Sequence, residues 1–501
     1  MSSVAKNAYT ELVSSVRKTF NTGKTRPISF RVQQLKNMEM MIRENSNEIL
    51  DALSKDLRKP KLEATLYELE IILNELKGLI KNCKKYAEAD KLPVNLLAIL
   101  DTAYIRKEPY GVVLVLGAWN YPVLLSLQPA MGAICAGNCV VIKPSELASH
   151  SAKLMAELIP KYMDADAYRV VLAEVEGTKD LLANKWDYIF CTGGTNVGKA
   201  VMQAAAPNLT PVTLELGGKS PCYVDESADF DLAAKRILWG KFANLGQTCI
   251  APDYVLCSKN AEKAFLKVAN IVLKEWYGDD LQGNSDIPRI VNPRHCKRLK
   301  ALLETTRGKI VFGGTTDEKD LWIEPTIVVD VDGDDPLMQD EIFGPILPII
   351  TVNSIQEAID FINGRPRPLA LYSFAKNEKM NDRLIENTTS GGVCVNDTMW
   401  HMAWHGLPFG GIGDSGMGNY HGKFSFDAFS HHRSVLNRSF SVLSEKLGEA
   451  RYPPYTVGKL RFFQTILKSF EFFNCTGGKY ITHLLAAMIG AAIFALITYS
   501  G

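Results

Sequence analysis

The chain has almost no surplus of charge of either sign. Its 501 residues include 56 basic and 55 acidic side chains, which gives a net charge of +1. Nucleic-acid binding depends on a clustered excess of Lys and Arg, so we expect no nucleic-acid partner. With 47% hydrophobic and 22% charged residues, the composition is that of a folded globular protein. The length exceeds what one hydrophobic core supports, and we expect two or three domains.

Cysteine pairs are also lacking. The ten cysteines are scattered, with no C-x-x-C pair and no histidine at metal-ligand spacing. We therefore expect neither a disulfide framework nor a metal site, and a reducing compartment is the default. The N-terminus lacks the apolar run of a secretory signal. Its basic first forty residues are compatible with a transit peptide, but Leu12, Val13, Val16 and Phe20 stand at helical spacing and favour an amphipathic helix.

Charged residues are missing from one end of the chain. Residues 481–501 contain no Asp, Glu, Lys or Arg, and residues 484–497 are almost wholly apolar. About twenty helical residues cross a ~30 Å hydrocarbon core, and basic residues next to such a span stay in the cytosol. We therefore expect a transmembrane tail anchor at 481–501, with the body on the cytosolic face of a membrane. The endoplasmic reticulum is favoured over the peroxisome or outer mitochondrial membrane, and a buried core helix is the alternative interpretation.

Short apolar runs alternate with helical stretches between residues 111 and 206. The runs at 111–117, 139–142, 169–172 and 188–190 predict buried strands, and helices are predicted at 126–137, at 150–162 and in the stretch ending at 206. This alternation indicates an α/β fold with a parallel, doubly wound sheet. Ligands of such sheets bind at the carboxyl ends of the strands, where Lys143 and a glycine turn at 193–198 fall. The turn lacks the G-x-G-x-x-G fingerprint, but it leads into a helix start that favours a phosphate.

Two motifs after this region suggest covalent catalysis. Cys249 ends the small, polar segment 244–249, and Glu215 begins the sequence Glu-Leu-Gly-Gly-Lys. A thiol is a strong nucleophile once ionised, and a carboxylate can activate the water that releases what the thiol has captured. The alternative for Cys249 is an inert buried thiol. The alternative for Glu215 is a strand-end carboxylate in an ion pair, for which Lys219 is the candidate partner.

Seven segments of the chain resemble the aldehyde dehydrogenase superfamily and occur in the order of that family. They are residues 117–122, 143–146, 193–198, 215–219, 246–249, 341–345 and 408–411. The resemblance spans about residues 17–438 and is closest to the class 3 branch. The apolar tail is similar to that of the membrane-bound fatty aldehyde dehydrogenases.

The resemblance implies a role for each candidate residue. Cys249 attacks the aldehyde to give a thiohemiacetal, which NAD oxidises to a thioester, with NADP as an accepted substitute. Asn120 and the backbone N–H of Cys249 stabilise the oxyanion. Glu215 is the general base for thioester hydrolysis, and Glu341 is its rival. The cofactor-binding residues are Lys143 and Glu146 for the adenosine ribose, Gly193, Gly194, Thr195, Asn196, Val197 and Gly198 in the phosphate turn, and Glu341 and Phe343 for the nicotinamide ribose.

The family fold further implies a division of the chain and a homodimer. A Rossmann-like NAD(P)-binding domain covers 1–85 and 107–212, an α/β catalytic domain covers 213–402, and a small β oligomerisation arm covers 86–106 and 403–440. A membrane-proximal segment at 441–480 precedes the anchor at 481–501. The expected activity is oxidation of long-chain aliphatic (fatty) aldehydes to carboxylic acids. A medium-chain or aromatic aldehyde dehydrogenase, with the tail only an address, is the nearer alternative, and a catalytically inactive scaffold is the more distant one.

Overall fold

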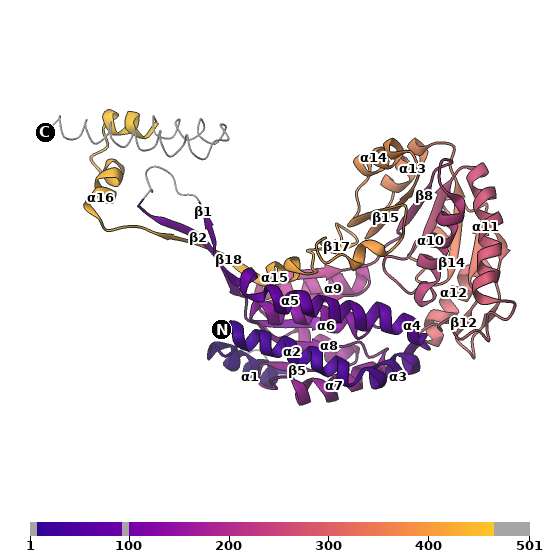
Figure 1. The fold of residues 1–501 in the computed structure, drawn as a ribbon, viewed down its shortest axis with the longest axis horizontal. Coiled ribbons are helices and arrows are strands. Elements are labelled where there is room, and N and C mark those ends of the chain that lie inside the picture. The colour runs from indigo at the N-terminus through magenta and orange to yellow at the C-terminus, as the bar shows by residue number, and fades with distance from the viewer. Residues whose placement is uncertain (1–7, 93–99, 465–501) are drawn as a thin grey trace. The chain divides into compact units, whose positions relative to one another are not determined.

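The computed structural model describes residues 8–92 and 100–464, traced in Figure 1. The chain divides into two compact units, residues 1–86 with 109–430 and residues 87–108 with 431–501. Across 8–92 and 100–464, no helix is both long enough and apolar enough to cross a membrane. The predicted tail anchor at 481–501 lies outside the described residues, as does the later part of the predicted membrane-proximal segment.

The first unit contains a six-stranded sheet in the order β17-β7-β6-β3-β4-β5. Its strands are β3 (Val112–Leu116), β4 (Cys139–Lys143), β5 (Tyr168–Val170), β6 (Tyr188–Thr192), β7 (Val212–Glu215) and β17 (Gly416–Met417). All neighbours pair in parallel except β17, which runs antiparallel to β7. The four strands predicted from the apolar runs are confirmed as β3 to β6.

Helices cover this sheet and form the N-terminal part of the unit. They are α1 (Thr10–Asn21), α2 (Ile28–Glu44), α3 (Ser46–Leu57), α4 (Lys61–Ala64), α5 (Ile71–Ala87), α6 (Leu124–Ala136), α7 (Ser149–Tyr162), α8 (Val175–Leu182) and α9 (Thr195–Ala205). Helices α1 and α6 contact β3 and β4, and α9 contacts β6 and β7. A π-helical turn, η1 (Thr65–Glu70), joins α4 to α5. The amphipathic helix predicted near the N-terminus is α1, which buries Val13 and Val16.

A seven-stranded sheet in the order β10-β13-β14-β9-β8-β15-β16 forms the other half of this unit. The strands are β8 (Pro221–Val224), β9 (Tyr254–Cys257), β10 (Lys309–Phe312), β13 (Thr326–Val329), β14 (Ile346–Thr351), β15 (Ala370–Phe374) and β16 (Gly392–Val395). Only β10, at the edge, is antiparallel to its neighbour. The accompanying helices are α10 (Phe230–Phe242), α11 (Lys259–Tyr277), α12 (Pro293–Thr305), α13 (Ile355–Asn363) and α14 (Glu378–Asn387), and a small hairpin pairs β11 (Thr316–Asp317) with β12 (Trp322–Ile323).

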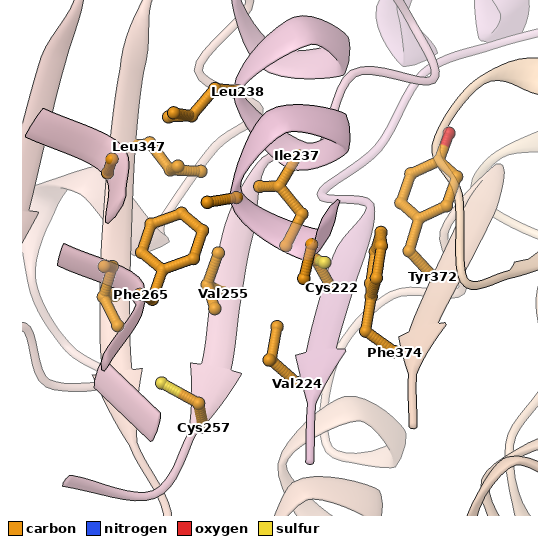
Figure 2. Packing of buried hydrophobic residues seen from close by; sticks show 14 of the residues in the cluster. Cys222, Val224, Ile237, Leu238, Val255, Cys257, Phe265, Leu347, Tyr372 and Phe374 are labelled. Atoms are coloured by element: carbon orange, nitrogen blue, oxygen red, sulfur yellow. The ribbon is translucent and has the colours of Figure 1, made fainter. Parts of the chain in front are cut away.

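Successive residues of the central strands pack into different hydrophobic clusters. Cys222 and Val224 of β8 share one cluster with Ile237 of α10 and Phe265 of α11 (Figure 2). Tyr223, between them in sequence, lies in a second cluster with residues of α12 and α13. Because side chains alternate across a strand, β8 is covered by helices on both faces. This double burial explains why such strands appear in the sequence as continuous apolar runs.

The second unit is built around a three-stranded sheet in the order β1-β2-β18. Its elements are β1 (Asp90–Leu92), β2 (Thr102–Pro109), β18 (Ser430–Asn437), α16 (Val442–Gly448) and the short helix η7 (Glu449–Arg451). Every residue of β1 and β2 is exposed or half-buried. Residues 403–430, which the sequence assigns to the arm, group with the first unit, and the division into domains stays a prediction.

Candidate active site

The segment that carries Cys249 leaves regular helix just after α10. Asn244, Leu245 and Gly246 all have positive φ angles, of 51°, 52° and 73°. Left-handed backbone costs about 1–2 kcal/mol for most residues with a Cβ, and such strain gathers at functional sites. At Gly246 a side chain is excluded as well, because a Cβ there would lie 2.3 Å from the carbonyl oxygen of Gly344. This strained turn therefore fixes the path of the backbone that leads to the Cys249 thiol.

Cys249 itself is partly buried, whereas most of the other described cysteines are fully buried. Burial raises the pKa of its thiol well above the usual value, and the charges of Glu341 and Glu215 raise it further. The backbone N–H groups of Cys249 and Ile250 lower the pKa, because they donate to the sulfur. The thiol is therefore protonated in this state, and its proton must leave before the sulfur can act as a nucleophile.

Glu215 is the last residue of β7 and is buried, and neither of its carboxyl oxygens has a hydrogen-bond partner within the described part of the chain. Burial raises its pKa well above the ordinary value. The alternative of an ion pair with Lys219 is wrong, because the Lys219 ammonium bonds Asp253 at 2.5 Å and the Leu337 carbonyl at 2.7 Å. Buried polar groups are usually satisfied, so an unpaired buried carboxyl that acts electrostatically on a thiol is a candidate functional group.

Glu341 acts electrostatically on the same thiol from a different segment, after the short helix η5 (Pro336–Met338). Burial, followed by the negative charge of Asp253, raises its pKa to about 8, although an N–H bond from Gly218 acts in the opposite direction. The structure thus brings both candidate bases, Glu215 and Glu341, within electrostatic range of Cys249. Groups with such raised pKa values are suited to exchanging protons near neutral pH.

Asn120 lies in the loop between β3 and α6 and is buried. Its side-chain amide donates to the main-chain oxygen of Gln247 at 3.0 Å. An amide nitrogen has two N–H donors, so a second one remains for a ligand. Next to it, the Tyr121 hydroxyl lies 2.9 Å from Oγ1 of Thr248, the residue before Cys249. Direct hydrogen bonds therefore join the loop of the predicted oxyanion donor to the loop of the predicted nucleophile.

The predicted cofactor residues lie at the carboxyl ends of β4 and β6. Lys143 ends β4, and its ammonium contacts the Glu146 carboxylate at 2.5 Å. Gly193 and Gly194 follow β6 and lead into α9, where no described side chain caps the helix at Gly194. The leading N–H groups of α9 can therefore bind an anionic ligand such as a phosphate.

The turn into α9 also has the close packing that a dinucleotide site needs. The first turn of the helix consists of Thr195, Asn196 and Val197. A Cβ at Gly198 would lie 2.9 Å from the methyl groups of Leu216, so a larger residue there would force the Leu216 side chain to shift. The N–H of Gly193 donates to the main-chain oxygen of Glu215 at 3.0 Å, which ties the turn to the predicted base. The residues present fit NAD(P).

Phe343 also lies close to the other site residues. Its φ of 47° is an outlier for an aromatic residue, a conformation that surrounding structure has to impose. Its ring meets Trp119 edge-on with centroids 5.3 Å apart, and Trp119 directly precedes Asn120. The segment predicted to hold the nicotinamide ribose therefore contacts the predicted oxyanion loop.

The apolar environment of the thiol was not predicted from the sequence. Cys249 packs against the same hydrophobic cluster as Trp239, Met402 and Phe409. The indole N–H of Trp239 donates to the hydroxyl of Tyr67 at 2.9 Å, and the two rings lie edge to face. These side chains come from segments far apart in the chain, so no local pattern marks them as neighbours.

Comparison with known proteins shows the family of the chain. The model of the aldehyde dehydrogenase family matches residues 1–435. Aldehyde dehydrogenase family 3 member A2 of Rattus norvegicus is 49% identical over 462 residues, covering 92% of this chain and 94% of that relative. The Rattus norvegicus protein named aldehyde dehydrogenase, dimeric NADP-preferring, is 49% identical over 448 residues, with coverage of 89% and 98%. The substrate-bound structure of Staphylococcus aureus AldH matches with a TM-score of 0.89 and 43% identity, covering 92% of this chain and 100% of that one.

Proposed function

Because the chain belongs to the aldehyde dehydrogenase family, whose members oxidise aldehydes to acids with NAD(P)+, we propose that it oxidises long-chain aliphatic aldehydes through a thioester on Cys249. One observation carries the proposal: two carboxyls, the buried Glu215 and the half-buried Glu341, both act electrostatically on one partly buried thiol. Such a set suits attack by a thiol followed by hydrolysis of the acyl group.

The first step is attack by the sulfur of Cys249 on the aldehyde carbon. The S–H proton passes to one of the two neighbouring carboxylates, a C–S bond forms, and negative charge develops on the aldehyde oxygen. The free N–H of the Asn120 amide and the backbone N–H of Cys249 donate to this oxygen, and the product is the oxyanion of a thiohemiacetal. Donors held in place before the reaction stabilise the developing charge without reorganising.

When bound, the nicotinamide of NAD(P)+ supplies the two-electron oxidant that turns the thiohemiacetal into a thioester. Lys143 and Glu146 are suited to the adenosine ribose, and the first turn of α9 to a phosphate. The Glu146 carboxylate would repel a phosphate on the ribose 2′ oxygen, which supports NAD as the preferred cofactor. The relative named NADP-preferring keeps NADP as the alternative.

Hydrolysis of the thioester needs a base that can hold a water molecule. Glu341 accepts the Gly218 N–H and lies against Gly217. Glu215, in contrast, has both oxygens unengaged among the described residues, and we favour it as the general base. Glu215 takes a proton from water, the water oxygen bonds the acyl carbon, and the C–S bond breaks. The carboxylic acid leaves and the thiol of Cys249 is restored.

A long hydrocarbon chain as substrate is supported by apolar surface near the site. Met402 packs against the cluster that Cys249 contacts. In the same segment, Trp400, Trp404 and Leu407 expose 57%, 62% and 50% of their surface. Exposed apolar groups of this size mark interaction surfaces, and burying a hydrocarbon chain against them is favourable.

The proposal is tested by following NADH absorbance with the purified full chain. We expect turnover with NAD+ that is faster for hexadecanal than for short aldehydes, and essentially none for Cys249→Ser. Residual activity of the Cys249→Ser enzyme would contradict the thiol mechanism. A maximum of kcat/KM at medium-chain or aromatic aldehydes would favour the alternative substrate, with the tail serving only as a membrane address.

We further propose a homodimer anchored through residues 481–501 on the cytosolic face of a membrane, the endoplasmic reticulum being favoured. One relative, from Rattus norvegicus, carries the word dimeric in its name. The three-stranded sheet of the second unit, whose β1 and β2 have no fully buried residue among those described, offers a surface for a second copy. Sedimentation of the detergent-solubilised chain would distinguish a dimer from a monomer.

A further inference from the structure

Four hydrogen bonds close a ring around the loops that carry Asn120 and Cys249. Lys59 donates to the main-chain oxygen of Asn120 at 2.9 Å, and the Asn120 amide donates to the oxygen of Gln247. The Gln247 amide donates to the main-chain oxygen of Arg289 at 3.0 Å. The N–H of Arg289 donates to the oxygen of Leu57 at 2.9 Å, and the chain from Leu57 to Lys59 completes the ring.

Lys59 holds its side of the ring with a fully buried charge. Its ammonium pairs with the Glu68 carboxylate at 2.7 Å, and both side chains have no exposed surface. The other oxygen of Glu68 accepts the N–H groups of Val123 and Leu124, at 2.9 and 3.2 Å, where α6 begins. A single ion pair therefore fixes both the carbonyl of Asn120 and the end of the short loop that follows it.

The burial of this pair is better explained by geometry than by stability. Removing two charges from water costs so much that a buried ion pair is often no more stabilising than an apolar pair of the same shape. What the Lys59 ammonium contributes is a set of contacts in fixed directions. It meets Glu68, the Asn120 carbonyl and the ring of Tyr121, whose centre lies 4.0 Å away. A compact cation with three such contacts leaves the Asn120 loop little freedom to shift.

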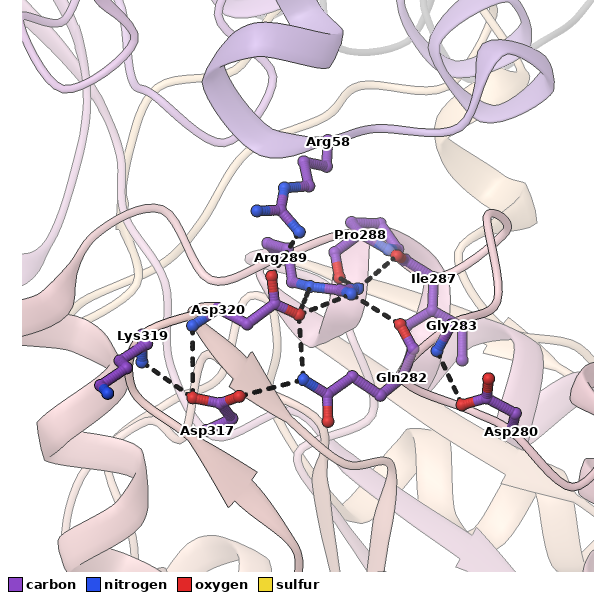
Figure 3. Close-up of polar contacts among 10 residues, drawn as sticks. All are labelled: Arg58, Asp280, Gln282, Gly283, Ile287, Pro288, Arg289, Asp317, Lys319 and Asp320. Carbon is purple, nitrogen blue, oxygen red and sulfur yellow. Dashed lines mark hydrogen bonds and ion pairs between the residues drawn. The ribbon is translucent and has the colours of Figure 1, made fainter.

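Arg289 holds the opposite side of the ring, and Figure 3 shows its contacts with Asp320 and the neighbouring carbonyls. Its guanidinium bonds the Asp320 carboxylate at 2.9 and 2.8 Å, and Asp320 also accepts Arg58, the neighbour of Lys59, at 2.5 Å. The remaining donors of Arg289 go to the carbonyls of Gln282, Ile287 and Pro288. One buried guanidinium thus shapes the loop whose carbonyl receives Gln247.

We propose that Lys59 and Arg289 are positioning residues, which set the amide of Asn120 against the thiol of Cys249. This inference rests on the proposed function, in which Asn120 stabilises the oxyanion. An amide is planar, so fixing one N–H on the Gln247 carbonyl also fixes the direction of the second. Loosening the ring moves that second N–H away from an oxygen that is charged only in the transition state. The effect therefore falls on kcat and leaves KM nearly unchanged.

The test combines a charge-free ring with the removal of Asn120. Lys59→Met with Glu68→Gln removes both charges, shortens the side chain at 59 by one atom, and keeps an acceptor for the start of α6. We expect kcat of the full chain to fall about 10–100-fold, with little change in KM for the aldehyde. In an Asn120→Ala enzyme the same pair of changes should lower kcat by less than about threefold, because the amide through which it acts is absent.

Asp320→Asn tests the other, partly exposed side of the ring. It serves if Lys59→Met with Glu68→Gln does not fold. It should lower kcat about 3–10-fold, and again only when Asn120 is present. The matched control is Arg17→Met with Asp187→Asn, which removes an ion pair whose carboxylate also accepts a backbone N–H, that of Val112. The control should lower the melting temperature and leave kcat unchanged.

The same assay of the unaltered chain and of Cys249→Ser tests the proposed function separately. The positioning role alone is overturned if the unaltered chain is active and the ring changes lower kcat equally with Asn120 present and in the Asn120→Ala enzyme. Unchanged kcat in both ring variants overturns it as well. An unaltered chain that reduces no NAD(P)+ with any aldehyde overturns the proposed function and the inference together.

Discussion

The carboxyl of Glu341 occupies the space that a side chain at Gly217 would need. A Cβ on Gly217 would lie 2.2 Å from Oε2 and 2.5 Å from Oε1 of Glu341. Gly217 stands two residues after Glu215. A single glycine therefore allows the two candidate bases to approach the same short segment beside Cys249.

Gly217→Ala should displace Glu341 and lower kcat by about 10–100-fold, since shifts of about 1 Å at a catalytic group have effects of this size. The cost in folding free energy should stay near 1–3 kcal/mol, about that of a crowded site. Gly78→Ala is the matched control, because no described atom lies within 4 Å of a Cβ there. As an alanine within a helix it should be neutral or stabilising by about 0.5–1 kcal/mol. Full kcat in Gly217→Ala would contradict the arrangement.

Glu215→Gln should separate acylation from hydrolysis. If Glu215 activates the water, mixing the variant with aldehyde and NAD+ should give a rapid burst of about one NADH per subunit, followed by turnover slowed about 10²–10⁴-fold. Hydroxylamine attacks thioesters without a general base and should partly restore turnover. The roles of Glu215 and Glu341 are reversed if Glu341→Gln gives the burst and Glu215→Gln does not.

The stability of the fold should depend on pH through Glu341. Its pKa is raised to about 8, chiefly by burial and then by Asp253. In the unfolded chain the pKa of Glu is about 4.3, so the folded state binds this proton more tightly and its stabilising contribution is complete below about pH 4. The contribution is lost as the pH rises through about 8. The melting temperature of Glu341→Gln should therefore fall less between about pH 5 and pH 9 than that of the unaltered chain; equal falls would contradict the assignment.

Local sequence patterns sufficed for four strands of the six-stranded sheet, and they named as candidates residues that the fold brings together, whose roles stay predictions. Cys249 and Glu215 lie in short segments whose residue types suggest a nucleophile and a base. Lys59 and Glu68 carry no such signal, because charged residues are usually exposed and only the fold shows this pair fully buried. The same limit applies to the alternative interpretation that paired Lys219 with Glu215. Proximity in sequence suggested Glu215, whereas the folded chain brings Asp253 to 2.5 Å.

Glu146→Gln should shift cofactor preference toward NADP. Glu146 lies three residues after Lys143, with which it pairs, and its side chain is 33% exposed, so its charge is partly screened but still near the proposed ribose site. Without that charge, the ratio of kcat/KM for NADP+ to that for NAD+ should rise about tenfold, which corresponds to about 1.4 kcal/mol. Glu176→Gln is the control, because Glu176 forms a pair of the same spacing with Lys179 on an exposed helix. If this ratio is the same in Glu146→Gln as in the unaltered chain, Glu146 is not part of the cofactor site.

Deleting residues 481–501 should release the enzyme from membranes and leave its chemistry intact. Every candidate site residue belongs to the first compact unit, so kcat for a short, water-soluble aldehyde should not change. With a long-chain aldehyde presented in lipid vesicles the rate should fall, because anchoring places enzyme and substrate in the same bilayer. An unrelated transmembrane helix in place of 481–501 should restore both membrane binding and that rate. A truncated chain that still pelleted with membranes would contradict the anchor, whereas full activity on vesicle-borne aldehyde after truncation would leave the tail as an address only.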